Sequence, residues 1–427
     1  MAYTNAIPMP FFLFLFVQLF NVSSSGSPHL LGSFHVNQPG YIAVINSENS
    51  TSHALLISSF NGIPFTADHL YRVTDVRTHL GSLSNIHPDL ITTSVTWPNE
   101  VNVIPHDVFD SSMVAVAGGF LVPFKTKGTI TLFNTTGSTV KGPYEITGSK
   151  TDHDWFYHRV RWTDMNGDGV KDAVTCRGKK STFGGSSGQL VWFEHPRLFR
   201  DNMLYPWTAH VIGDDSDTFF DITTLPSSDG MLPCIITTGY FSNKLKIYWT
   251  TDPNASWNDL TTIHSRIIES SIGHVFDVQV ADLNDDGNAD LLVTANGISQ
   301  TGLYIYEVPS DFRTGTFTRH VLKSDFHSHN ILPGGGAPGS AQIIREATNS
   351  TGKPMILLSG DDDSRAYLFS PQSTSASDWS YRMDIFLDTH SGTIGGMAYS
   401  DVDGDGYPEI FVPAYSHNLV YVYTLKQ

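Results

Sequence analysis

Asp164-Met165-Asn166-Gly167-Asp168-Gly169-Val170-Lys171-Asp172 is the first of three related nine-residue stretches in this 427-residue chain. The other copies are Asp282-Leu283-Asn284-Asp285-Asp286-Gly287-Asn288-Ala289-Asp290 and Asp401-Val402-Asp403-Gly404-Asp405-Gly406-Tyr407-Pro408-Glu409. Each copy has oxygen-bearing side chains at positions 1, 3, 5 and 9, and glycine at position 6, which permits the sharp turn that folds them inward. Ca²⁺ is a hard cation that binds oxygen ligands in irregular geometry. The pattern therefore predicts three structural Ca²⁺ sites, whose ligands are Asp164, Asn166, Asp168 and Asp172; Asp282, Asn284, Asp286 and Asp290; and Asp401, Asp403, Asp405 and Glu409.

The spacing of the copies indicates the architecture. Their first residues are 118 and 119 residues apart, and half of that distance, roughly 59 residues, suits one blade of a β-propeller with generous loops. Weaker copies occur at the half-steps and upstream, each before a short apolar run. The seven anchor positions are 46, 107, 164, 225, 282, 346 and 401. The chain is therefore predicted to be an all-β protein with seven blades.

Each unit reads as four short strands of alternating or fully apolar residues between turn residues. The fifth unit shows this most clearly, with predicted strands at 276–281, 291–294, 303–307 and 317–322. The last unit has only three strands, and a spare strand-like segment, residues 28–34, lies near the start of the chain. We expect this segment to pair beside residues 419–424 as the outer strand of the seventh antiparallel blade, which closes the ring.

The first 25 residues are predicted to be a signal peptide rather than part of the fold. Residues 11–20 form an apolar stretch of suitable length, and small residues that suit signal peptidase follow it. Residues 26–427 are then one propeller domain, secreted and extracellular, with no membrane span because the apolar stretch is too short. Asn-x-Ser/Thr sequons predict glycosylation at Asn49, Asn134, Asn254 and Asn349.

Charge and cysteine content restrict the partners. The formal net charge of −17 disfavours nucleic acid and anionic membranes. The only two cysteines, Cys176 and Cys234, fall on second strands of neighbouring blades, where either a disulfide or two buried thiols is possible. Neither supplies a zinc or catalytic-cysteine motif, and we expect a monomer.

The carboxylate loop between the first and second strands resembles that of the FG-GAP/VCBS-repeat β-propellers. That family includes the integrin α-subunit head, a seven-bladed fungal lectin, and propeller parts of some carbohydrate lyases. The resemblance covers nearly all of residues 28–427 and implies a seven-bladed propeller with Ca²⁺ in the three loops. The family contains binding proteins and enzymes alike, so only the metal positions are carried over to this chain.

Candidate ligand residues lie at the start of the predicted inner strands, which line the central channel. His153 and His390 stand eleven residues before an anchor, and His274 stands eight before one. If they converge, they could bind ligand or a second metal at a histidine-rich channel mouth. The alternative is that they are separate turn histidines on different blades.

The densest cluster of chemistry-bearing residues spans 153–161. Trp155 could stack on a sugar ring, and Arg159 and Arg161 could hold a carboxylate. His158 and Tyr157 could move protons, so these two and Arg159 are the candidate catalytic residues for β-elimination from a uronate. The alternative is an ordinary packed inner strand, because polar and apolar residues alternate here.

Three functions are consistent with this sequence. The leading one is a secreted, calcium-binding propeller that binds or acts on carbohydrate, a glycan or acidic polysaccharide, at one asymmetric face of its channel, opposite the Ca²⁺ loops. The asymmetry follows from Trp155, Arg159 and Arg161, which have no equivalents in other blades. The alternatives are a uronate lyase using the His, Tyr and Arg of blade three, and a non-catalytic extracellular or biomineral matrix protein.

Overall fold

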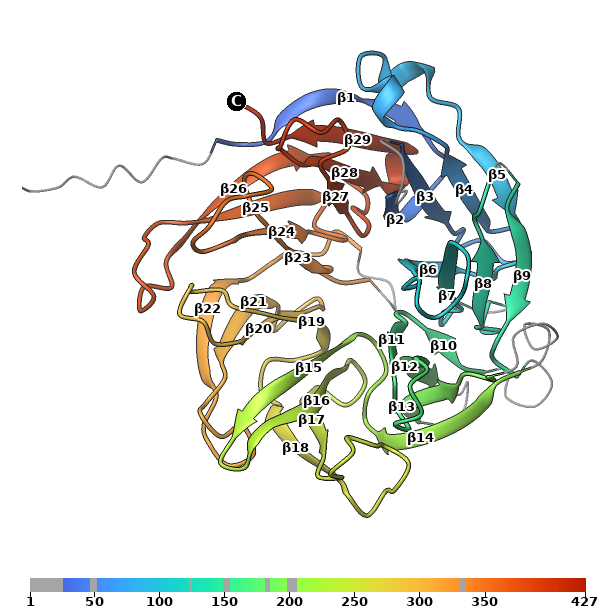
Figure 1. Ribbon diagram of the computed structural model, residues 1–427. Helices are drawn as coiled ribbons and strands as arrows, with labels where there is room; N and C mark the ends of the chain where they lie inside the picture. The colour runs from blue at the N-terminus through green and yellow to red at the C-terminus, as the bar shows by residue number, and fades with distance from the viewer. Residues whose placement is uncertain are drawn as a thin grey trace, which may run out of the picture.

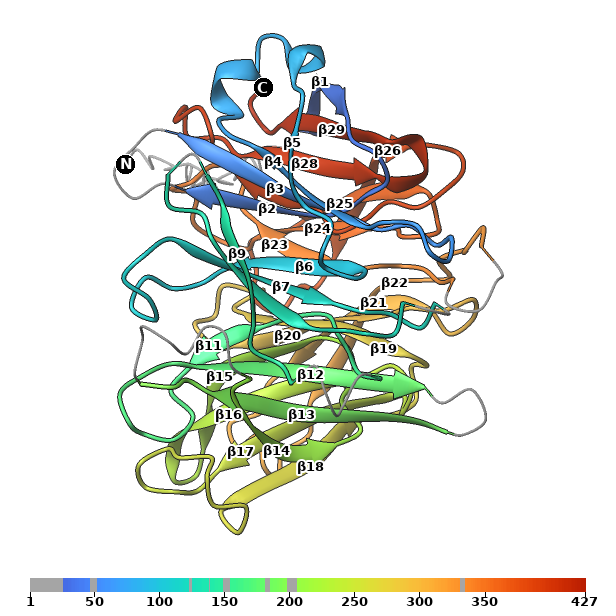
Figure 2. The same ribbon diagram turned by 90° about the vertical axis from the view of Figure 1, so that its right-hand side faces the viewer.

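The described residues form a closed ring of seven antiparallel blades around a central channel (Figure 1). The computed structural model describes residues 26–46, 52–122, 125–137, 139–148, 154–180, 185–197, 206–330 and 335–427. The strands run between the two faces of the ring (Figure 2). The predicted fold class, seven four-stranded blades, is confirmed.

Blades one to three contain the following strands, from the channel outward. Blade one consists of β2 (Pro39–Asn46), β3 (His53–Ser59), β4 (His69–Val73) and β5 (Asp89–Thr92). Blade two consists of β6 (Pro98–Val103), β7 (Met113–Gly118), β8 (Ile130–Asn134) and β9 (Lys141–Glu145). Blade three has its inner strand divided into β10 (Phe156–Tyr157) and β11 (Arg161–Thr163), followed by β12 (Asp172–Lys180), β13 (Ser186–Glu194) and β14 (Thr208–Asp214).

Blades four to seven repeat the arrangement. Blade four consists of β15 (Phe220–Ser227), β16 (Gly230–Gly239), β17 (Lys244–Thr250) and β18 (Ile263–Glu269). Blade five consists of β19 (Val275–Ala281), β20 (Asp290–Ala295), β21 (Gly302–Glu307) and β22 (Thr318–Ser324). Blade six consists of β23 (Ala341–Ile344), β24 (Met355–Ser359), β25 (Arg365–Pro371) and β26 (Tyr381–Asp388). Blade seven consists of β27 (Ala398–Ser400), β28 (Glu409–Ala414), β29 (Leu419–Thr424) and β1 (His29–His35).

Helical structure is minor. The described residues contain the short 3₁₀ helices η1 (Arg77–His79), η2 (Leu83–Asn85) and η4 (Tyr415–His417). No helix in the described part of the chain has the length and apolar character needed to cross a membrane.

The ring is closed both at its periphery and near the channel. At the periphery, β1 pairs antiparallel with β29, from His29 opposite Thr424 to His35 opposite Leu419, which confirms the predicted closure. Near the channel, the N–H of Gly396 donates to the carbonyl oxygen of Gly40 (2.8 Å), and the N–H of Ile42 donates to that of Gly396 (3.2 Å). The N-terminal strand is therefore hydrogen-bonded into blade seven at the periphery, and blades seven and one are hydrogen-bonded to each other near the channel.

The apolar core is distributed over the blade interfaces. Seven clusters of buried residues lie between successive blades, including one between blades seven and one that contains Phe34, Ile57 and Phe411. Cys176 and Cys234 are buried free thiols within two of these clusters. Of the two possibilities left open by the sequence, a disulfide or two buried thiols, the structure has the thiols. Each blade thus buries both faces, and the closed ring leaves no interface open.

Every outer strand carries a β-bulge with its extra residue on the outer side of the pair. In five blades the extra residue is apolar and packs on an interface cluster: Ile91, Ile212, Ile268, Leu322 and Phe386. A bulge bends and twists a strand, so these outer edges are poor templates for pairing with another chain.

The inner closure generates a stability prediction. A Cβ added to Gly395 would overlap the carbonyl oxygen of Gly40, which is backbone and cannot move aside without opening the junction. We expect Gly395→Ala to lower the free energy of unfolding by about 2 kcal/mol or more. Gly81→Ala is the matched control because nothing lies within 4 Å of its added Cβ. Equal urea midpoints for the two variants would contradict a structural role for the inner junction.

Candidate functional site

The three carboxylate loops adopt one hydrogen-bonding pattern. The position-one aspartate accepts the backbone N–H of position six with one oxygen: Gly169 to Asp164 at 2.8 Å, Gly287 to Asp282 at 2.8 Å, and Gly406 to Asp401 at 2.9 Å. Its other oxygen accepts the N–H of position four in each loop. Positions four and six both have positive φ, which explains the glycines.

The position-nine carboxylate anchors each loop from the start of the second strand. Asp172, Asp290 and Glu409 each accept the backbone N–H of position two, at 2.9, 3.0 and 3.0 Å. The glutamate in the third copy therefore takes the role of the aspartates. Burial raises the pKa of Asp172 to about 6 and those of Asp290 and Glu409 to about 7; the backbone donors oppose this shift, whereas the other loop carboxylates add to it.

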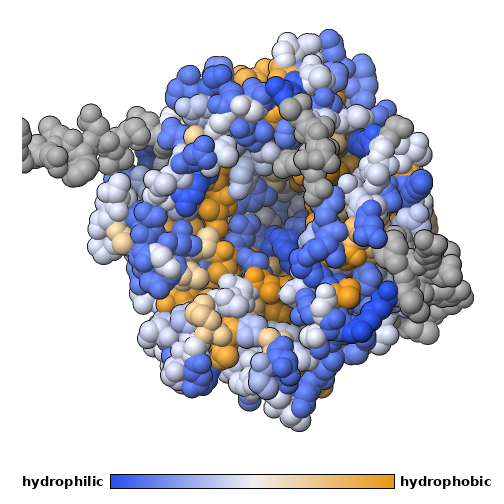
Figure 3. Space-filling view, in the orientation of Figure 1, coloured by the Kyte–Doolittle hydropathy of each residue, from blue (hydrophilic) through white to orange (hydrophobic). Residues whose placement is uncertain are grey.

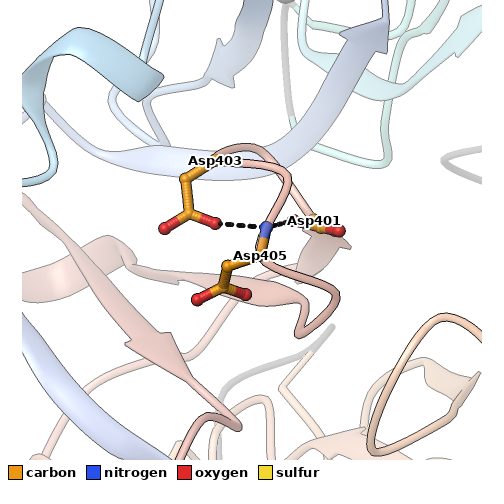
Figure 4. Close-up of side chains that lie close together, drawn as sticks. All are labelled: Asp401, Asp403 and Asp405. Carbon is orange, nitrogen blue, oxygen red and sulfur yellow. Dashed lines mark hydrogen bonds between the residues drawn. The ribbon is translucent and has the colours of Figure 1, made fainter.

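The donor set fits Ca²⁺. All the side chains at positions 1, 3, 5 and 9 offer hard oxygen ligands, and the ligand atoms of Asp401, Asp403 and Asp405 lie within 4.8 Å of one another. Figure 4 shows these three on one turn, where the N–H of Asp405 donates to both Asp401 and Asp403 (3.1 Å each). Arg197 pairs with Asp168 (2.7 Å) and Lys426 with Asp405 (2.8 Å), each at one carboxylate of its loop. A bound divalent cation would stabilise the remaining clustered carboxylates.

A hub of charged residues fills the middle of the channel. Arg159, between β10 and β11, donates from Nε to Glu100 on β6 (2.7 Å) and from Nη1 to Asp277 on β19 (3.0 Å). The same Nη1 donates to the carbonyl oxygen of Phe220 on β15 (3.2 Å), and the guanidinium lies 4.4 Å from the ring centroid of Phe219. One buried side chain therefore joins the inner strands of blades two, three, four and five.

A cavity of about 330 Å³ adjoins this hub on the side of the carboxylate loops. Its walls come from the inner strands of blades one, two, three, five, six and seven, and Figure 3 shows a hollow at the middle of the ring. The polar side chains that line it are Tyr41, Glu100, Asn102, Arg159, Arg161, Gln279, Ser340, Gln342 and Tyr399. The sequence predicted a site opposite the Ca²⁺ loops, whereas this cavity lies in the loop-side half of the channel.

A bulge in the inner strand of blade three decides where the predicted site residues lie. Tyr157 lies opposite Arg177, and Arg161 lies opposite Val174. The inner strand therefore has one more residue between Tyr157 and Arg161 than β12 has between Val174 and Arg177. The extra residue changes the face on which side chains emerge. Trp155 and Tyr157 consequently lie in the cluster between blades two and three, while Arg159 and Arg161 line the cavity. The rings of Trp155 and Tyr157 do not line the cavity, and the guanidinium of Arg177 covers Trp155 at 4.3 Å.

His158 is enclosed by aromatic rings. Its centroid lies 5.3 Å from those of Phe156 and Phe219, and 6.0 to 6.3 Å from those of Phe120 and Phe276. It is 4% exposed and its Nδ1 has no hydrogen-bond partner among the described residues. Burial lowers its pKa to about 4, an effect that Glu100 opposes. This geometry suits a neutral core histidine and offers no path to a substrate in the cavity.

The other predicted ligand histidines do not converge in the described structure. His274 stacks on Tyr240 with centroids 4.3 Å apart and its Nδ1 lies 2.8 Å from the carbonyl oxygen of Tyr240. His390 is at the surface, paired with Asp388 at 3.3 Å. His153 lies outside the described residues. Within the described ranges, Asp401, Asp403 and Asp405 are the one group of three or more His, Cys, Asp or Glu with converging ligand atoms, so the second metal stays a prediction.

The predicted glycosylation sites also stay predictions. Asn254 and Asn349 lie on exposed turns, and Asn134 is half-buried at the end of β8. Asn49 lies outside the described residues.

Glu100 and Asp277 belong to the hub but were not among the residues predicted from the sequence. Both stand on inner strands whose neighbours are largely apolar, as in Glu100-Val101 and Asp277-Val278. A charge on a buried strand requires a counter-charge. The pairing with Arg159 could therefore have been predicted, because all three lie five to seven residues before an anchor.

Comparisons with known proteins identify no family. No family model matches the chain, and no curated protein matches it. Among solved structures it is similar to one described as the structure of the Dos1 propeller, with 10% sequence identity and a TM-score of 0.45, over 88% of this chain and 76% of that one. The seven-bladed assignment rests on the strand pairing described above, and the FG-GAP/VCBS resemblance stays a prediction.

Ca²⁺ is predicted to stabilise the fold, because only the folded loops present their ligands together. At a free Ca²⁺ concentration about 100-fold above Kd, each site would add about 2.7 kcal/mol. EGTA should lower the melting temperature measured by calorimetry, and Asp286→Asn should reduce that shift. Asp110→Asn, in the degenerate loop at anchor 107, is the matched control and should behave as wild type. Identical melts with Ca²⁺ and with EGTA would refute the assignment.

The buried His158 predicts sensitivity to acid. Its folded-state pKa is lowered, so its contribution to stability is fully present above the ordinary histidine value and is lost as the pH falls toward about 4. Between pH 7 and about pH 4.5, wild type should lose about 2 kcal/mol more stability than His158→Leu. His390→Leu, at a side chain that is 89% exposed, should keep the full wild-type dependence. Parallel pH profiles for wild type and His158→Leu would contradict the neutral, buried state.

Proposed function

We propose that this protein is a secreted, Ca²⁺-binding β-propeller that binds carbohydrate in its central channel. The observation that carries the proposal is the cavity of about 330 Å³, which combines planar amides, hydroxyls and a guanidinium with apolar side chains from the same strands. Sugars present both hydroxyl groups and apolar C–H faces, and a mostly preformed cavity with a few fixed polar groups is the usual form of a small-ligand site.

The polar groups of the cavity are held in place and not all are satisfied. Gln279 and Gln342 each donate an amide N–H to the carbonyl oxygen of the next blade, Ala341 and Met397, both at 2.6 Å. Their amide oxygens are then the groups available to a hydroxyl donor. Asn102 accepts from Arg161 (2.6 Å), but its Nδ2 is buried without a partner among the described residues. The isolation of that donor costs about 1–3 kcal/mol, and a rotation of the amide that brought Nδ2 to the cavity surface would let a ligand hydroxyl satisfy it.

Binding is better supported than catalysis. The candidate proton carriers Tyr157 and His158 are 3% and 4% exposed and do not line the cavity. Glu100, the one carboxylate among the described residues that line the cavity, bridges two arginines. Burial raises its pKa, but both guanidiniums together hold that pKa below the ordinary value. A carboxylate that stays ionised in this way is a poor general base.

The proposal is tested by a glycan array in Ca²⁺-containing buffer, with Asn102→Leu and the matched control Asn258→Leu, whose side chain is exposed. Wild type and Asn258→Leu should bind a common set of glycans, and Asn102→Leu should lose at least about tenfold in affinity, because the cavity loses its unpaired donor. Uronate-containing glycans incubated with the protein should stay uncleaved, as followed by ultraviolet absorbance of unsaturated uronates.

Absence of binding across the array would overturn the carbohydrate proposal and leave the matrix function, which depends on the Ca²⁺ loops alone. Equal binding by wild type and Asn102→Leu would place any glycan site outside the channel. Release of unsaturated products would establish the lyase alternative.

A further inference from the structure

We propose that the channel cavity selects neutral sugar units against acidic ones, with Glu100 as the residue that sets this selectivity. The inference rests on the proposed function and adds the charge class of its ligand. It reverses the expectation from sequence, in which Arg159 and Arg161 would hold a carboxylate.

Glu100 occupies both arginines. Its Oε2 accepts from Nε of Arg159 (2.7 Å), and its Oε1 accepts from Nη1 of Arg161 (3.1 Å). One carboxylate of this chain therefore neutralises part of the charge that a ligand carboxylate would use. Recognition of an acidic sugar through Nε of Arg159 or Nη1 of Arg161 would require displacement of Glu100, whose side chain is only 18% exposed.

Carboxylates already outnumber guanidiniums around the hub. Arg159 also pairs with Asp277, whose side chain is 2% exposed and whose Oδ2 has no partner among the described residues. Asp221 adds a third carboxylate that acts on Arg159, and it is held by the backbone N–H groups of Ile222 and Val280. Two guanidiniums thus face three carboxylates, so a uronate would bring a fourth anion into a poorly solvated channel.

Burial makes that repulsion effective. Burial raises the pKa of Asp277 to about 6; Arg159 opposes the shift and Glu100 adds to it. Keeping these carboxylates ionised in the channel therefore already costs free energy, and a further negative charge beside them would add electrostatic repulsion. A neutral pyranoside avoids this cost because its hydroxyls use the Asn102 donor and the Gln279 and Gln342 acceptors.

The test is titration calorimetry with matched sugar pairs that differ only at C6, methyl glucoside with methyl glucuronide and methyl galactoside with methyl galacturonide. Wild type should bind the neutral member of the preferred pair at least about tenfold more tightly. Glu100→Gln, which keeps the shape but removes the negative charge between the two guanidiniums, should reduce that ratio at least about fivefold or reverse it. Glu269, on the outer strand β18, forms an ion pair with Arg319 away from the channel. Glu269→Gln removes the same charge there and should keep the wild-type ratio.

The outcomes separate the two proposals. Equal or tighter binding of the uronate by wild type would overturn charge selection while leaving carbohydrate binding intact. Binding of neither member of either pair, together with an empty glycan array, would end the proposed function and the selectivity with it. If Glu100→Gln does not fold, the wild-type ratio alone decides charge selection, and Arg161→Gln then tests the pair from its more exposed side, with an unchanged or increased neutral preference expected.

Discussion

Each blade of this protein is apolar on both faces, and this constraint determines the rest of the structure. A sheet that is apolar on two sides cannot be stable alone in water, so it has to lie between two others. Repetition of that requirement gives a ring, and the ring has to close because any open end would expose an apolar face and a sheet edge. The seven interface clusters, the pairing of β1 with β29 and the junction of Gly396 with Gly40 are all consequences of it.

The same constraint separates stability from function. Since the interfaces supply the core, the inner strands are free to carry polar residues where they face the channel. The Arg159 hub uses that freedom to connect four blades, and Gln279, Gln342 and Tyr399 connect blades five, six and seven through backbone carbonyls. The polar lining of the cavity is therefore both the internal support of the ring and the surface at which we propose that a ligand binds.

Much of the fold could be predicted from the sequence, because repeat spacing and strand periodicity are local properties. The expected strands of blade five differ from β19 to β22 by one or two residues at their ends, and the loop pattern at Asp164, Asp282 and Asp401 identified the first turn of three blades. The site was predicted less well. The bulge between Tyr157 and Arg161 changes the face on which side chains emerge, and periodicity alone does not reveal one extra residue. The partners of Arg159 lie on other blades, so they required a three-dimensional arrangement or a charge-pairing argument.

The pairing of β1 with β29 also fixes the order in which the protein can be completed. The N–H of Gln38 donates to the side-chain oxygen of Asn418, 380 residues further along the chain, and the strands on either side of this bond are the first and last of the ring. During synthesis the earliest blade strand has to wait, unpaired, until nearly all the others have been made. Final assembly therefore has to wait for the last strand of the ring, and the unfinished ring is the state in which this protein most needs protection from aggregation.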